Sequence, residues 1–203
     1  MKKQIVIIHG GTSFKMYDDF LSYLKTKEIS LEKLRPHKDW KDTLVSELHD
    51  TYEILMPRMP NGTNARYEEW KLWFSRIAEV LNEEVILIGH SLDGIFLTKY
   101  LSENTFPKRI RSTILVAAPF DDEDDLESGE SLADFTPSSS LKKFAKQGGK
   151  IYLLHSKDDP VIPFIQLKKY QQRLPDAEVV VFEDREHFNQ ETFPEIVEII
   201  KSI

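Results

Sequence analysis

The chain has 203 residues, and its 27 Lys and Arg against 34 Asp and Glu give a formal net charge of −7. Hydrophobic residues make up 40% and charged residues 30%, which is typical of a soluble globular protein and excludes a disordered or membrane chain. The acidic balance argues against nucleic acid as a partner, because neutralising phosphates requires a basic face. The absence of cysteine excludes disulfides, a cysteine nucleophile and thiolate metal sites.

The length fits one domain spanning residues 1–203. The apolar run at residues 5–8 is too short for the core of a signal peptide, and no run approaches the length of a membrane span. We therefore expect a cytoplasmic protein without membrane contact. The oligomeric state is left open.

Six short apolar runs predict the strands. Most are apolar throughout instead of alternating, which is typical of strands covered on both faces. The runs are residues 5–8, 52–56, 85–88, 113–116, 151–154 and 179–182.

Helical patterns separate and follow these runs. Apolar residues at i, i+3, i+4 spacing predict helices over residues 70–81 and 196–203. Thr192 and Glu195 predict a capping box that opens the last helix. The alternation predicts an α/β fold, with a mostly parallel sheet of about six strands and helices on both faces.

Two segments fit this scheme poorly. Residues 14–38 predict an extra helix and a basic loop after the first strand. Residues 120–140 are acidic and then serine-rich, which indicates either a solvated loop or a small lid over the site.

The third run leads into Gly-His-Ser-Leu-Asp-Gly at residues 89–94 and then into an apolar helix over residues 95–101. A serine at a sharp strand-to-helix turn has its hydroxyl exposed above the sheet, so Ser91 is the candidate nucleophile. The alternative is that Ser91 caps the helix, which is a common role for serine.

Carboxylates and a histidine follow the last two runs: Asp158 and Asp159 after the fifth, and His187 after the sixth. The carboxyl ends of parallel strands meet at one edge of a sheet, where we expect these residues to join Ser91. A serine hydroxyl needs a histidine to take its proton, and that histidine needs a carboxylate to fix its tautomer. The sequence therefore predicts a Ser-His-Asp triad, with either aspartate as its acid.

The chain resembles the small serine hydrolases of the α/β-hydrolase superfamily that are related to retinoblastoma-binding protein 9 and to the bacterial YdeN-like proteins. The motifs that carry the resemblance are His-Gly-Gly at 9–11, Met-Pro at 59–60, Gly-His-Ser at 89–91, Asp-Asp-Pro at 158–160 with Pro163, and residues 182–193. The resemblance implies a three-layer α/β-hydrolase sandwich without a large cap domain. It also implies that Asp159, immediately before the proline, is the triad acid, and that Asp158 is a turn residue and the alternative.

The charge on a tetrahedral intermediate requires two backbone donors. We expect the N–H of Leu92, after the nucleophile, and the N–H of Gly11 in the loop after the first strand, with Thr12 as the alternative to Gly11. The spacing at residues 9–13 matches neither phosphate-binding glycine motif, which disfavours a phosphate loop. His9 and His90 are interpreted as packing or supporting residues.

Two acidic residues depart from the family pattern, which has glycine where this chain has Asp93 and Glu186. Both side chains turning to solvent would leave the triad working. Carboxylates near the oxyanion or the histidine would instead impair it. A third interpretation is a metal site made of Asp93, Glu186 and His187.

We predict a carboxylesterase-like serine hydrolase that cleaves a small carboxylic ester or thioester through an acyl-enzyme, with no cofactor and no metal. Ser91 attacks, His187 transfers the proton, Asp159 orients the histidine, and Leu92 and Gly11 hold the oxyanion. The absence of a large cap favours short acyl groups. The alternative is an interaction protein of the same fold in which Asp93 and Glu186 impair the site.

Overall fold

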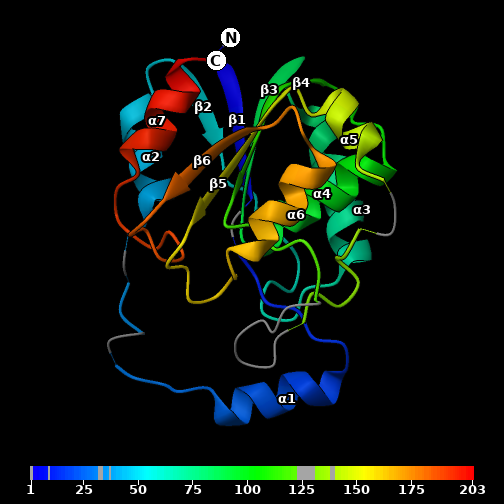
Figure 1. Ribbon diagram of the computed structural model, residues 1–203, viewed down its shortest axis with the longest axis vertical. Helices are drawn as coiled ribbons and strands as arrows, with labels where there is room; N and C mark the ends of the chain where they lie inside the picture. The colour runs from blue at the N-terminus through cyan, green and yellow to red at the C-terminus, as the bar shows by residue number, and fades with distance from the viewer. Residues whose placement is uncertain (1, 9, 32–33, 37, 123–130, 138–139) are drawn as a thin grey trace.

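The computed structural model describes residues 2–8, 10–31, 34–36, 38–122, 131–137 and 140–203. Six parallel strands form one sheet in the order β2-β1-β3-β4-β5-β6 (Figure 1). The predicted parallel sheet is therefore confirmed. The strands are β1 (Lys3–Ile8), β2 (Tyr52–Leu55), β3 (Glu84–His90), β4 (Arg109–Val116), β5 (Lys150–Ser156) and β6 (Glu178–Phe182).

The sheet is covered on both faces, which explains the continuous apolar runs. In β1, Val6 and Ile8 belong to the hydrophobic cluster on one face, whereas Ile5 and Ile7 belong to the cluster on the other. All four side chains are buried. Because successive side chains of a strand point to opposite faces, a strand buried on both must be apolar at every position.

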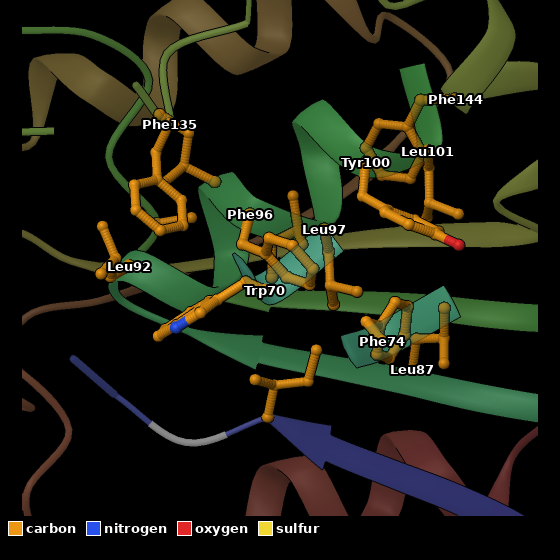
Figure 2. Packing of buried hydrophobic residues seen from close by; sticks show 14 of the residues in the cluster. Trp70, Phe74, Leu87, Leu92, Phe96, Leu97, Tyr100, Leu101, Phe135 and Phe144 are labelled. Atoms are coloured by element: carbon orange, nitrogen blue, oxygen red, sulfur yellow. The ribbon is translucent and has the colours of Figure 1, made fainter. Parts of the chain in front are cut away.

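Two helical layers enclose the sheet (Figure 1). The helices α2 (Trp40–Leu48) and α7 (Pro194–Lys201) supply the cluster on one face. The opposite face is covered by α3 (Tyr67–Val80), α4 (Leu92–Glu103), α5 (Lys142–Gln147) and α6 (Ile165–Arg173). Figure 2 shows Trp70 and Phe74 of α3 packed against Phe96 of α4, with ring centroids 5.4 and 5.5 Å apart.

The start of α7 corrects one sequence prediction. The helix begins at Pro194, its N-cap is Phe193, and no side chain caps it, so the capping box predicted from Thr192 and Glu195 is wrong. Proline at the first helical position has a φ already suited to the helix and lacks an N–H that would need a partner. That local chemistry replaces the cap.

The extra helix predicted within residues 14–38 is present as α1 (Tyr17–Thr26). It lies apart from the three layers, on the side of the carboxyl ends of the strands (Figure 1). None of its residues is buried, and its aromatic side chains Phe20 and Tyr23 contact the buried ring of Phe14. The helix is thus attached to the body mainly through that ring.

Within the segment 120–140, interpreted as a loop or a lid, residues 123–130 and 138–139 lie outside the described residues. On its described sides, the Asp122 carboxylate accepts hydrogen bonds from the Leu132 N–H and the Ser131 hydroxyl. The Ser13 hydroxyl donates to the Ser131 carbonyl. These bonds hold Ser131 and Leu132 beside the loop that follows β1.

The strand order reverses at β1 and β3. After β1 the chain passes to α2 on one face, and after β3 it passes to α4 on the other. Loops that leave neighbouring strands toward opposite faces open a crevice at the carboxyl ends, where ligands bind in such sheets. Among the described residues, no helix has the length and apolar character needed to cross a bilayer.

Candidate active site

Ser91 occupies the turn between β3 and α4. Its backbone is left-handed, with φ 57° and ψ −126°, a strained conformation for a residue with a side chain. The turn also requires glycine two residues earlier, because a Cβ on Gly89 would lie 2.7 Å from the Asp93 carbonyl oxygen. Ser91 stands at the N-cap position, but its hydroxyl makes no capping bond within the described chain. The hydroxyl therefore remains available to the cavity.

His187 meets Asp159 as the predicted triad requires. The Nδ1 atom of His187 lies 2.9 Å from Oδ2 and 3.1 Å from Oδ1 of Asp159, whose side chain is fully buried. Because an ionised carboxylate can only accept, Nδ1 carries the proton and donates it to Asp159. The remaining nitrogen, Nε2, is then the basic one.

The two candidate acids hold different places. Oδ1 of Asp159 also accepts hydrogen bonds from the Val161 and Ile162 N–H groups, at 2.8 and 2.9 Å, which fix the carboxylate facing His187. Asp158 is exposed; it accepts from the Ser156 hydroxyl and, at 2.9 Å, from the Glu186 N–H. The hydrogen bond from Ser156, with further backbone donors, lowers the pKa of Asp158. Asp159 thus contacts the imidazole, and Asp158 holds the backbone before it.

The side chains of His90 and Trp40 form hydrogen bonds with the backbone of the loop that carries His187. The Nε2 of His90 lies 2.8 Å from the His187 carbonyl oxygen, and the Trp40 indole N–H donates to the Phe188 carbonyl at 2.9 Å. Burial, with smaller effects of the Lys41 and His187 charges, holds the pKa of His90 well below its usual value. The ring is therefore neutral at neutral pH, and Nε2–H is the donor.

Ser91 and His187 face one open cavity of about 700 Å³, which also touches α1. No hydrogen bond joins the Ser91 hydroxyl to the His187 ring in the part of the chain that the structure describes. Such bonds are often long without substrate and tighten when it binds. The sheet edge therefore brings together all three predicted triad members, two of them in direct contact.

The loop after β1 distinguishes the two candidates for the second oxyanion donor. The Thr12 N–H already donates to the Gly62 carbonyl at 2.9 Å. Gly11 lies beside Ser91 in the cavity, and a Cβ there would lie 2.7 Å from the Gly62 oxygen, so the close approach of the two loops requires glycine. Leu92 is the first residue of α4, where the N–H has no partner within the helix.

Asp93 does not turn to solvent, which corrects one of the interpretations drawn from the sequence. It is 0% exposed, and neither carboxylate oxygen has a hydrogen-bond partner among the described residues. Burial raises the pKa of Asp93 well above its usual value, against a smaller opposing effect of Lys41. Burial thus favours the neutral acid, which places no negative charge beside the proposed oxyanion donors.

Glu186 is exposed, as the solvent-facing interpretation requires, and its φ of 46° is left-handed. That backbone favours glycine, which explains why the family pattern has glycine before the histidine. With Asp93 enclosed and Glu186 at the surface, the predicted metal interpretation lacks converging ligands. The described residues contain no group of three or more His, Asp or Glu side chains placed to hold a metal ion.

Several residues at the site carry no signal in the sequence. Tyr23 and Leu24 of α1 line the large cavity, as does Lys27, the residue after the helix. Lys41, a nearly buried cation paired with Asp39 at 2.7 Å, lines it too. Their positions depend on how the segment before α2 folds back over the sheet edge. No spacing rule connects residues this far from Ser91.

The covered parallel sheet, with a serine on its strand-to-helix turn and a histidine–aspartate pair beside it, defines an α/β-hydrolase. The profile of the family described as "Serine hydrolase" matches residues 33–200, so the chain belongs to that family. The resemblance drawn from the sequence is confirmed.

Individual relatives agree with this assignment. Serine hydrolase RBBP9 of Rattus norvegicus is 29% identical over 152 residues, covering 75% of this chain and 78% of that protein. YdeN of Bacillus subtilis (strain 168) is 26% identical over 189 residues, covering 93% and 87%.

Solved structures show the same fold. The crystal structure of the B. subtilis ydeN gene product has a TM-score of 0.77 at 23% identity, covering 99% of this chain and 98% of that one. A carboxylesterase of Nitrososphaera gargenis has a TM-score of 0.64 at 16% identity, covering 99% and 89%.

Proposed function

We propose that this chain hydrolyses a small carboxylic ester or thioester through an acyl-enzyme on Ser91, with His187 and Asp159 completing a triad. The observation that carries the proposal is the contact between His187 Nδ1 and the buried Asp159 carboxylate, at 2.9 Å, in the cavity that Ser91 lines. This contact leaves the basic Nε2 atom to accept a proton.

In the first half of the reaction, Ser91 Oγ attacks the carbonyl carbon while His187 Nε2 takes the hydroxyl proton. The negative oxygen accepts hydrogen bonds from the N–H groups of Leu92 and Gly11. Collapse breaks the bond to the alcohol or thiol, which leaves with the proton from His187. Asp159 stabilises the positive imidazolium between these transfers.

In the second half, His187 takes a proton from water as the water oxygen attacks the acyl carbon. The second tetrahedral intermediate expels Ser91 Oγ, which regains its proton from His187, and the free acid leaves. The ester or thioester, one water molecule and the side chains of Ser91 and His187 balance both halves.

The alternative function, an interaction protein with impaired catalysis, rests on Asp93 and Glu186. The raised pKa of Asp93 and the exposure of Glu186 remove the electrostatic reason for impairment. Both observations support the catalytic function over the alternative.

The test combines active-site labelling with turnover. A fluorophosphonate probe is expected to label the parent protein at Ser91, and p-nitrophenyl acetate is expected to be hydrolysed. Ser91→Ala should lose the labelling and nearly all turnover. Labelling that persists in Ser91→Ala, or a parent that neither labels nor turns over, contradicts the proposal and favours the interaction protein.

A further inference from the structure

Two cavities of very different size meet at Ser91. The inner cavity, about 30 Å³, is lined by Ser91 together with Leu92, Pro119, Leu132 and Ile162. The outer cavity, about 700 Å³, is the open one lined by Ser91, His187 and α1. The inner cavity is roughly the size of one or two water molecules, whereas the outer one has the size of a small-molecule site.

The proposed catalytic groups are divided between these cavities. Leu92, a proposed oxyanion donor, lines the inner cavity and not the outer one. His187 lines the outer cavity and not the inner one. Gly11 and Ser91 line both.

This division orients a bound ester. In the tetrahedral intermediate, the carbon holds Ser91 Oγ, the oxyanion, the acyl substituent and the leaving oxygen. The leaving oxygen must take its proton from His187, which places the alcohol or thiol in the outer cavity. With the oxyanion at the Leu92 and Gly11 amides and the leaving group toward His187, the inference places the remaining acyl substituent in the inner cavity, on the side of Ser91 away from His187.

The residues that line the inner cavity are packed and hydrogen-bonded, so the cavity cannot easily enlarge. Leu92, Leu132 and Ile162 are each at most 4% exposed, and Leu132 belongs to the main hydrophobic cluster. The Leu132 backbone is tied to Asp122, and the Ile162 N–H to Asp159. Enlarging the cavity would therefore disturb packed side chains and the carboxylate that faces His187.

We propose that the substrates are esters or thioesters of a short acid, acetyl to propionyl, with a much larger alcohol or thiol held between α1 and the sheet edge. This inference rests on the proposed function and adds the substrate class. Side chains of α1 such as Tyr23 and Leu24 then contact the alcohol or thiol.

The test uses two isomeric esters of identical composition, hexyl acetate and ethyl hexanoate. The first has its long chain on the alcohol, and the second has it on the acid. Because overpacking a small cavity is costly, kcat/KM for hexyl acetate is expected to exceed that for ethyl hexanoate by about 10-fold to 100-fold. A second pair, p-nitrophenyl acetate and hexanoate, measures the acyl side with a better leaving group and should show the same preference for acetate.

Variants of the lining residues test whether the preference for short acyl groups comes from the inner cavity. Leu132→Ala should raise the hexanoate-to-acetate ratio about 10-fold by opening the inner cavity. Ile162→Val removes one methylene, is expected to stay folded, and should raise the butyrate-to-acetate ratio by a smaller factor, about 3-fold. Leu72→Ala, at an exposed position on α3 that lines neither cavity, should leave the ratios unchanged.

The outcomes separate the two proposals. Equal turnover of both isomers, or faster turnover of the hexanoates, overturns the assignment of the cavities and leaves the proposed hydrolase standing. Unchanged ratios in both inner-cavity variants also overturn it. If no ester is hydrolysed and Ser91 is not labelled, the proposed function fails and the substrate class fails with it.

Discussion

The turn that holds Ser91 and the loop that holds His187 are built in opposite ways. The turn is local: strand β3, residues 89–94 and helix α4 follow one another in the chain, and Gly89 allows the close approach. The loop is held by distant residues. His187 contacts Asp159 and His90, and the Trp40 indole N–H donates to the carbonyl of Phe188, 148 residues away. A local geometry can be read from a short motif, and a distributed one cannot.

The largest expected effect is on the loop. Asp159→Asn should lower kcat about 10⁴-fold, because an amide stabilises neither the required tautomer nor the imidazolium. Asp158→Asn keeps an acceptor oxygen for the Glu186 N–H and the Ser156 hydroxyl and removes only the negative charge, so a loss of at most about 10-fold is expected. Steady-state kinetics of both variants measure the difference. Equal losses would contradict the assignment of separate roles to the two neighbours.

A side chain added in the turn that holds Ser91 should lower the stability of the protein. Gly89→Ala brings a Cβ within 2.7 Å of the Asp93 carbonyl oxygen and is expected to lower the free energy of unfolding by about 3 kcal/mol. Gly10→Ala is the matched control, because no atom lies within 4 Å of a Cβ there. Denaturant unfolding of the two variants gives the comparison. Similar stability of both would show that the turn tolerates a side chain.

Asp93 should make the free energy of unfolding of the protein depend on pH. A carboxyl whose folded pKa is raised imposes no penalty below its unfolded pKa, about 3.9, and stability falls as pH rises from there through the folded pKa. Asp93→Asn should therefore match the parent near pH 4 and exceed its free energy of unfolding by about 2 kcal/mol at high pH.

Unfolding curves across this pH range test the effect of Asp93. The exposed Asp18→Asn is the control, and its pH dependence should follow that of the parent. A parallel shift of the Asp93→Asn curve at every pH would indicate a packing effect instead of titration.

The smallest expected effect concerns the backbone of the loop. Glu186→Gly removes a side chain from a left-handed residue and should raise the free energy of unfolding by about 1 kcal/mol. Asp184→Gly, in the same loop but outside the left-handed region, should be neutral or destabilising. Thermal unfolding distinguishes the two, and a destabilised Glu186→Gly would exclude relief of strain.

The contrast also explains what the sequence could predict. The six strands follow from apolar runs, because burial on both faces leaves no room for polar residues. Ser91 follows from residues within the turn itself. The choice of Asp159 over Asp158 required the family resemblance. Both aspartates follow the fifth strand, at the sheet edge where His187 is expected, and only the packing of the folded chain shows which carboxylate contacts the imidazole.

Other features depended on tertiary contacts. Asp93 is buried because the rest of the fold encloses the first turn of α4. An aspartate in the first turn of a helix is usually exposed to solvent, so the sequence did not predict this burial. The cavity-lining face of α1 is equally unpredictable, because that helix buries no residue of its own. The true start of α7 at Pro194 shows that a motif two residues away can mislead.

His90 is the covalent neighbour of Ser91 and the hydrogen-bonded neighbour of the His187 carbonyl, at 2.8 Å. One hydrogen bond therefore ties the end of β3, which leads into Ser91, to the loop after β6, which carries His187. The proposed nucleophile and the proposed base are in this way coupled through the backbone, as their proposed alignment for proton transfer requires.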